Sequence, residues 1–289
     1  ANQCHAESGS IIHKLSSRKL TYGEVVEDAS KLPIPKTVTL KDPRDYKIIR
    51  KPLPRMDNPA KISGQAVFGL DKRLPGMQFA VVERNPRFMG KVKSFDSTET
   101  MKVPGVKQVL KVERDVFGWM LEGVAVVADS TWAAMQGRKV LKVEWDDSGF
   151  EHLSTAQLYE RMRSQLKAGN VLNVRSQGNF DTAFERSEKK VEALYETPYE
   201  SHSNMEPLNC IAHVKDDACE IWGPIQGPDW IQGEVAGQLK LPPEKVTVNM
   251  TFLGGGLGRK AFTDYTFEAV ALSKAIKAPV QVIWTREDD

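Results

Sequence analysis

The chain has 289 residues, 40% of them hydrophobic and 27% charged, an ordinary composition for a soluble globular protein of two or three domains. A net charge of +2, spread along the chain, gives no reason to expect nucleic acid or an anionic membrane as a partner. No apolar run approaches the roughly 18 residues that a membrane span requires, and the first residues lack the apolar core of a signal peptide. We therefore expect a soluble protein, either cytoplasmic or periplasmic.

The N-terminal segment, 1–55, ends in a proline-rich stretch. Residues 51–61 favour an extended linker and place the first boundary. Before it, a helical pattern begins with Thr21 as N-cap and ends at Pro33. This segment is too small to fold alone.

The next stretch, 56–149, alternates strands and helices. Strand patterns are expected at 77–86, 106–114, 123–130 and 140–147, and a helix that begins after Ser130 precedes the last of them. The pattern predicts a small mixed α+β domain.

The remaining stretch, 150–289, begins with Ser154 and Gln157, which form a capping box for a helix that reaches about Lys167. The further elements expected are a hairpin at 209–222, helices at 230–241 and 265–276, and strands at 245–253 and 279–284. Nothing follows the last strand, so we expect the sheet to end on an uncovered strand and the chain to be incomplete.

Cysteine and histidine give no sign of a metal site, and no direct metal ligand is predicted. Cys4, Cys210 and Cys219 cannot build a disulfide framework or a four-thiolate site. In the hairpin, Cys219 would lie opposite Val214, so the thiols are expected to be reduced and partly buried. The histidines never show the spacing of a zinc-binding helix.

The densest glycine cluster, 254–258, lies between a strand and a helix. Backbone N–H groups at such a place favour an anion, and glycine lets the anion approach. The spacing is not that of a dinucleotide fingerprint or a P-loop, because Arg259 stands where each motif needs glycine. A tight turn without a ligand stays an alternative, and so does an unrelated phosphate-binding enzyme that uses this loop.

Six stretches carry a resemblance to a known family. They are PLPRMDNPAKISGQAVFGLDKRLPGMQFAVV (52–82), GVAVVADSTWAAMQGRKVLKVEWDD (123–147), SHSNMEPLNC (201–210), WGPIQGP (222–228), LGGGLGRKAFTDY (253–265) and PVQVIWTREDD (279–289). Their order over nearly the whole chain resembles the molybdopterin-binding large subunits of the molybdenum hydroxylases, the xanthine dehydrogenase and aldehyde oxidase family. Within it, the resemblance is closest to the bacterial isoquinoline 1-oxidoreductase type and its aldehyde-oxidising relatives.

The resemblance implies an α+β fold with three parts. These are the segment 1–55, which packs with the cofactor domain, an α/β-hammerhead domain over 56–149, and the first part of the molybdopterin-binding domain over 150–289. By the same comparison the chain is a fragment. A second cofactor-binding region and the glutamate that acts as catalytic base are expected beyond Asp289, so the chain itself carries no catalytic residue.

The resemblance also implies cofactor-binding residues. Gln226 matches the glutamine that hydrogen-bonds the apical oxygen ligand of molybdenum, a task that suits a neutral amide donor. The backbone of Gly254, Gly255, Gly256, Leu257 and Gly258 would face that oxygen and the pterin phosphate. Arg259 would pair with the pyrophosphate of a dinucleotide form. A loop-capping amide and a solvated arginine are the alternatives for Gln226 and Arg259.

Two departures from the family pattern concern the substrate. Leu257 stands where the family usually has phenylalanine, which weakens the case for packing against an aromatic substrate. Lys260 and Ala261 stand where the purine-oxidising branch has a carboxylate, which argues against a purine.

The pocket wall is expected to contain His202, Met205 and Glu206, from the HSNMEP stretch, and Trp222. Trp230 also flanks Gln226, although core packing is the commoner fate of tryptophan. A buried Glu206 can be interpreted as a general base, but we favour a role in orienting the backbone and the cofactor site.

The reaction implied is the hydroxylation of an electron-poor carbon in an N-heterocycle or an aldehyde, with water as the oxygen source. The cofactor would be molybdopterin with molybdenum, in the cytosine dinucleotide form. Electrons would pass to 2Fe–2S clusters on a partner subunit, because the chain has no cysteine set for them. Its other partner would be the remainder of its own large subunit, without which it would be inactive. A non-catalytic assembly module is the competing hypothesis.

Overall fold

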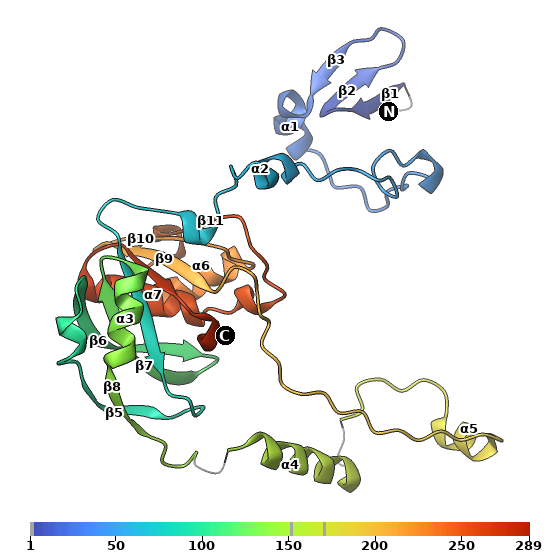
Figure 1. The fold of residues 1–289 in the computed structure, drawn as a ribbon. Coiled ribbons are helices and arrows are strands. Elements are labelled where there is room, and N and C mark those ends of the chain that lie inside the picture. Colours follow the sequence, from blue (N-terminus) through green and yellow to red (C-terminus); the bar gives the residue numbers. More distant parts are fainter. Residues whose placement is uncertain (1–2, 151–152, 170–171) are drawn as a thin grey trace. The chain divides into compact units, whose positions relative to one another are not determined.

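The computed structural model describes residues 3–150, 153–169 and 172–289, and the chain divides into two compact units, 1–59 and 60–289. Figure 1 labels the helices and strands. Helices and sheets are both present, and the α+β class predicted from the sequence is confirmed. A boundary near residue 149 inside the larger unit stays a prediction.

The smaller unit is a three-stranded antiparallel sheet followed by one helix. Its elements are β1 (Cys4–Glu7), β2 (Ser10–His13), β3 (Lys19–Thr21), α1 (Tyr22–Ser30) and a 3₁₀ turn at Pro43–Asp45. Thr21 caps α1 as expected, since its side chain accepts from the Glu24 N–H at 3.3 Å. Among the described residues of this unit only Ser10 is buried, so the unit has no apolar core of its own there.

The larger unit contains most of the regular structure. Its strands are β4 (Gln78–Arg84), β5 (Lys91–Asp96), β6 (Val106–Val116), β7 (Trp119–Ala128), β8 (Lys142–Asp146), β9 (Asn209–Val214), β10 (Cys219–Gly223), β11 (Val246–Met250) and β12 (Val280–Ile283). Its helices are α3 (Thr131–Val140), α4 (Thr155–Ala168), α5 (Phe180–Arg186), α6 (Pro228–Leu239) and α7 (Asp264–Ile276), and α2 (Asn58–Ile62) crosses the division between the units in the sequence. Short 3₁₀ turns lie at Gly69–Asp71, Thr100–Lys102, Pro243–Lys245, Arg259–Ala261 and Arg286–Asp288. No helix in the described ranges combines the length and apolarity needed to cross a membrane.

Seven strands form one sheet in the order β11-β10-β9-β12-β4-β7-β6. The last strand in the sequence, β12, lies in its middle, antiparallel to β9 and parallel to β4. The expectation of an uncovered last strand is therefore wrong, because β12 inserts between strands from two distant parts of the chain. β5 and β8 form a separate antiparallel pair.

Helices cover both faces of the large sheet, as the alternation of side chains along β4 and β7 requires. Val81 and Val126 pack with the alanines of α3 in a small cluster on one face. Val82 and Val127 point to the other face and join the main core, which includes α6 and α7 (Figure 1). The predicted N-cap Ser130 is confirmed for α3.

The C-terminal half of the fold is fixed by a buried carboxylate. Glu268, on α7, is fully buried. It accepts from Arg84 of β4, from Arg114 of β6 at 2.8 Å, and from the indole N–H of Trp284 at 2.9 Å. These bonds set the position of α7, and therefore of the glycine cluster that precedes it.

Candidate functional site

The glycine cluster forms a loop between β11 and the 3₁₀ turn at Arg259–Ala261. The backbone takes the left-handed conformation at Gly255, Leu257 and Gly258, with φ of +98°, +50° and +96°. Glycine adopts this conformation at no steric cost, whereas it is unfavourable for a leucine. The loop is therefore a sharply folded stretch of main chain.

Two side chains press against this loop and explain two of its glycines. A Cβ at Gly254 would overlap the Cβ of Glu206. A Cβ at Gly256 would come within 2.5 Å of Oε1 of Gln226. The loop is bare at these positions because Glu206 and Gln226 occupy the space of the missing side chains.

Gln226 is oriented by two backbone hydrogen bonds. Its Oε1 accepts from the Gly258 N–H at 3.1 Å, and its own N–H donates to the Lys260 carbonyl at 3.1 Å. Because an N–H can only donate, the amide atom that faces Gly258 is the oxygen. The NH₂ end therefore points elsewhere, and no acceptor for it lies among the residues that the structure describes.

The loop also carries backbone donors without a partner. The Gly254 and Gly258 N–H groups donate to Glu206 and Gln226, and the Arg259 N–H donates to the Gly256 carbonyl at 2.8 Å. The three consecutive N–H groups of 255–257 have no acceptor within the described parts of the chain. Successive unpaired N–H groups in a left-handed turn form a concave anion site.

Glu206 holds the start of the loop. Its N–H donates to the Gly254 carbonyl and its Oε2 accepts from the Gly254 N–H, both at 2.9 Å. The same oxygen accepts from Nζ of Lys260 at 3.0 Å, and this lysine is completely buried. Burial lowers the pKa of Lys260 more than the hydrogen bond and charge of Glu206 raise it. Lys260 was not predicted as a site residue, since a lysine in a first helical turn is usually solvated.

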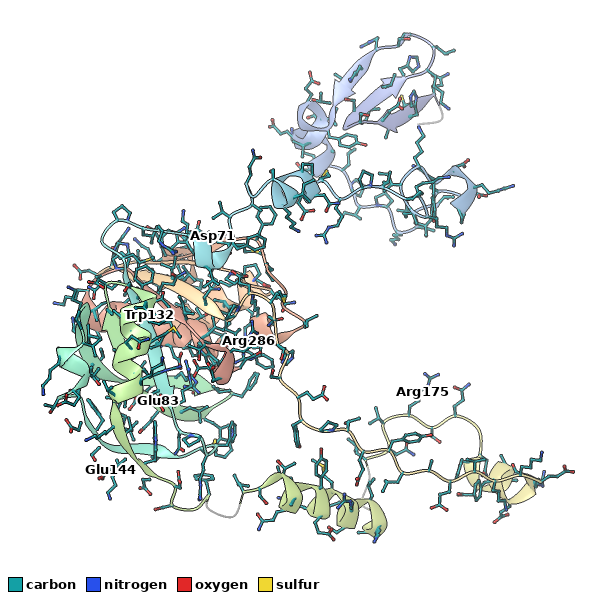
Figure 2. The ribbon with its side chains drawn as sticks, in the orientation of Figure 1. Asp71, Glu83, Trp132, Glu144, Arg175 and Arg286 are labelled. Atoms are coloured by element: carbon teal, nitrogen blue, oxygen red, sulfur yellow. The ribbon has the colours of Figure 1, made fainter. Side chains whose placement is uncertain are left out.

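Asn204 adds a polar group with no partner beside the loop. It is 2% exposed, and neither Nδ2 nor Oδ1 has a hydrogen-bond partner. A Cβ at Gly255 would lie 3.4 Å from its Oδ1. A buried amide normally finds a partner, so this one marks the loop as a place where a polar group can be held. Arg286, labelled in Figure 2, fixes this stretch by donating to the Asn204 carbonyl at 2.5 Å.

Arg259 is already engaged within the protein. Its guanidinium forms two hydrogen bonds to the Asp264 carboxylate, at 3.0 and 2.8 Å. It also lies over the Trp284 ring, 5.0 Å from the centroid. Two of its five N–H donors are thus used by Asp264, at the first residue of α7.

The other residues predicted for the pocket wall do not gather at the loop. His202 and Met205 are exposed, and Met205 is 88% accessible. Trp222 lines a separate groove of about 620 Å³ with Asn249 and Phe252. Trp230 stacks on Phe117, with ring centroids 6.3 Å apart. Among the residues predicted for the pocket wall, Glu206 is therefore the one that contacts the glycine loop.

The two cysteines in the sheet are buried thiols. Cys219 pairs with Val214 across the hairpin, as expected. Burial raises the pKa of Cys219 to about 12 and the pKa of Cys210 above its usual range, so both are protonated at neutral pH. All three cysteines of the chain are free.

A scan against protein families matches residues 163–289 to the molybdopterin cofactor-binding domain. The isoquinoline 1-oxidoreductase subunit beta of Brevundimonas diminuta is 28% identical, over all of this chain and 41% of that protein. Residues 163–289 therefore belong to the molybdopterin cofactor-binding domain family. The membrane-bound aldehyde dehydrogenase [pyrroloquinoline-quinone] of Gluconacetobacter polyoxogenes is 32% identical, over 97% of this chain and 37% of that protein.

A solved structure shares the fold of this chain. Quinoline 2-oxidoreductase from Pseudomonas putida 86 aligns with a TM-score of 0.60 at 20% identity, over 82% of this chain and 34% of that one. The chain thus spans well under half the length of these relatives. The region that matches the family model, 163–289, includes the glycine loop, Gln226 and Glu206.

The donors of the loop match the chemistry of part of a molybdopterin cofactor. The cofactor presents oxygen and phosphate acceptors, and the loop offers three consecutive N–H donors and the Gln226 amide. The unpaired amide of Asn204 lies beside them. None of these groups is a metal ligand, and no cluster of three His, Cys, Asp or Glu able to hold a metal occurs within the described ranges.

Proposed function

We propose that this chain supplies the glycine-loop side of the molybdopterin site in a molybdenum hydroxylase large subunit. The complete protein would hydroxylate an N-heterocycle or an aldehyde with water as the oxygen source. One observation carries the proposal. The Gly258 N–H fixes the Gln226 amide through its oxygen, which leaves the NH₂ donor beside the three unpaired loop amides.

The chain's own residues would bind and orient the cofactor. Gln226 Nε2 and the N–H groups of 255–257 would donate to its oxygen acceptors, while Glu206 keeps the loop in its folded shape. These donors are fixed before the cofactor arrives, so they stabilise charge without reorganising. When bound, the molybdenum cofactor supplies the two-electron oxidation chemistry of the reaction.

Arg259 would bind the pyrophosphate if the cofactor has the dinucleotide form. A contact with the pyrophosphate of the cytosine dinucleotide form would use the donors that Asp264 leaves free, because a guanidinium has five N–H groups. Arg259 would then bridge the phosphate and Asp264, without losing the pair that it already forms.

The parts of the site outside this chain also belong to the proposal. The catalytic glutamate and a second cofactor-binding region would follow Asp289, and a 2Fe–2S subunit would accept the electrons. His202, Met205 and Trp222 would reach the substrate pocket only if the remainder of the large subunit covers them. The chain by itself would then hold no cofactor tightly and be inactive.

The experiment replaces Gln226 with alanine in the intact enzyme complex. We expect turnover per bound molybdenum to fall by about 100-fold, the usual effect of removing one preorganised donor. Gln108→Ala, at an exposed position on β6, is the control and should leave turnover unchanged. Gly256→Ala should reproduce the loss, because its Cβ displaces the Gln226 amide.

Two outcomes would favour the competing functions. Undiminished turnover in an intact Gln226→Ala complex would show that Gln226 does not bind the cofactor, and it would favour a non-catalytic assembly module. Absence of molybdenum from the purified wild-type complex, with phosphate protecting the loop amides, would favour an unrelated phosphate-binding enzyme.

A further inference from the structure

Lys260 and Glu206 form an ion pair that is hidden from solvent. Lys260 is fully buried and Glu206 is 7% exposed, and Nζ lies 3.0 Å from Oε2. Removing two charges from water costs free energy that their attraction offsets only when the geometry is good and the other polar atoms are satisfied. A pair of apolar side chains would often be at least as stable, so stability alone is a weak reason for this pair.

The contacts of Glu206 connect the two ends of the glycine loop. Its Oε2 accepts both from the Gly254 N–H at the loop's start and from Lys260, two residues after the loop's end. Its Oε1 accepts from the Leu70 N–H and from Nδ2 of Asn209, each at 3.3 Å. One carboxylate therefore closes the loop and also anchors it to two elements outside it.

Lys260 passes this constraint on to Gln226. Its carbonyl accepts from the Gln226 N–H at 3.1 Å and from the hydroxyl of Tyr265 at 3.2 Å. Gln226 in turn accepts from Gly258. A shift of Lys260 would move the backbone of Gln226 and the loop amides together. The donors proposed for the cofactor all depend on where this lysine lies.

The same contacts argue against Glu206 as a general base. Both carboxylate oxygens already accept two hydrogen bonds, one of them from a charged donor. A base needs a free lone pair within reach of the substrate proton. Glu206 offers none in this arrangement.

We propose that Glu206 and Lys260 are positioning residues, which hold the loop amides and Gln226 in the arrangement that receives the cofactor. The inference rests on the proposed function for its link to turnover. Its structural part, that the ion pair orders the loop, stands on the contacts alone.

The experiment uses Lys260→Met, which keeps an unbranched side chain one atom shorter and removes its charge, and the neutral double variant Glu206→Gln with Lys260→Met. Both are made in the intact enzyme complex. The readouts are hydrogen–deuterium exchange of peptides over 253–262, molybdenum content, and turnover per molybdenum. Exchange of β9 and β12 peptides reports whether the sheet stays folded.

In Lys260→Met we expect exchange of the loop peptides to rise at least tenfold, with β9 and β12 unchanged. The double variant removes the unpaired buried charge, so it should recover thermal stability. It should not recover loop protection, molybdenum content or turnover per molybdenum. A matched control is Lys111→Met with Glu122→Gln, which removes the 2.9 Å ion pair between β6 and β7 and should leave the loop unchanged.

The outcomes separate this inference from the proposed function. Loop exchange that stays at the wild-type level in Lys260→Met overturns the inference, whatever the metal content. Full recovery of loop protection and turnover in the double variant overturns it too, because the pair would then be only a stabilising contact. If the wild-type complex holds no molybdenum, the proposed function fails, and loop exchange still decides whether the ion pair orders the loop.

Discussion

At the scale of single residues, Asp288 shows how a buried carboxylate fixes the last turn of the described chain. It is nearly buried and lies 2.9 Å from Nη1 of Arg138 on α3 and 3.1 Å from Nη1 of Arg84 on β4. It also accepts from the Thr285 N–H at 2.6 Å. Burial by itself raises the pKa of Asp288. The attraction of Arg84 and Arg138 lowers the pKa by a larger amount, so the net pKa lies below its ordinary value.

We predict that Asp288→Asn lowers the free energy of unfolding by about 3 kcal/mol at pH 7, since it leaves the mostly buried Arg138 without its close anion and Arg84 with Glu268 alone. The pKa is lower in the folded than in the unfolded state, so this carboxylate stabilises the fold above the ordinary aspartate pKa of about 4 and loses that effect as pH falls. Urea denaturation of both proteins at pH 7, 5 and 3.5 checks the prediction.

The difference between wild type and Asp288→Asn should shrink as the pH falls. Asp216→Asn, in the exposed turn of the β9–β10 hairpin, serves as the control and should change little at any pH. A stability difference that is constant from pH 7 to 3.5 would show that the charge of Asp288 does not cause it.

The residues of the site differ in how far the sequence can predict them. The glycines stand out because three in a row are unfavourable unless something approaches the backbone, and Gln226 follows from its match to a family motif. Sequence alone does not show that Glu206 and Gln226 are what approach the glycines. Nor does it show Lys260 as buried, because its partner lies 54 residues away.

At the scale of elements, two helices respond in opposite ways to the same substitution. Gly137, in α3, packs against the sheet, and a Cβ there would lie 2.9 Å from methyl groups of both Val106 and Val126. Gly233, in α6, is exposed, and a Cβ there would meet nothing within 4 Å. The first glycine lets a helix approach a sheet, whereas the second only weakens its helix.

We predict that Gly137→Ala destabilises the protein by about 1–3 kcal/mol through overpacking. Gly233→Ala should stabilise it by about 0.5–1 kcal/mol through better helix propensity. Urea denaturation monitored by circular dichroism measures both, and each variant is the control for the other. Equal effects of the same sign would contradict the packing that distinguishes α3 from α6.

The elements that the sequence predicts well are those with local signals. Thr21, Ser130 and Ser154 cap α1, α3 and α4. In each case the hydroxyl accepts from the N–H three residues later in the sequence, so the signal is local. The β5 strand and the hairpin of β1 and β2 were missed, since neither has a buried face that produces a strand pattern. Exposed strands are defined by their partners, which the local sequence does not show.

At the scale of the whole molecule, the order of the strands was the least predictable feature. β12 is the last of the described strands in the sequence, but it pairs with β9 and β4, whose residues lie about 70 and 200 positions earlier. Such pairings depend on contacts between distant segments, and no local pattern encodes them. The seven-stranded sheet of the larger unit is therefore built from two stretches of chain, one before and one after 153–203.

This separation leads to a prediction about proteolysis. Neither α4 nor α5 has a buried residue, so within the larger unit the protein should open there at low cost, and trypsin should cut within 153–203 before it cuts the sheet. The described residues of the smaller unit, 1–59, also lack a buried apolar core, and this unit should be cut early as well. The two pieces of the larger unit on either side of this cut share the sheet through β4 and β12, and they share the buried Glu268 with its two arginines. We therefore expect them to stay together in gel filtration and to separate only on a denaturing gel.

The pieces should depend on Glu268 for their association. In the cleaved protein, Glu268→Gln removes the charge between Arg84 and Arg114, at a cost of about 3 kcal/mol, so the pieces should separate at a lower urea concentration. Glu244→Gln, at an exposed position before β11, should leave that concentration unchanged. First cuts inside β4–β7, or pieces that separate at once without urea, would mean that the sheet does not join the two stretches as described.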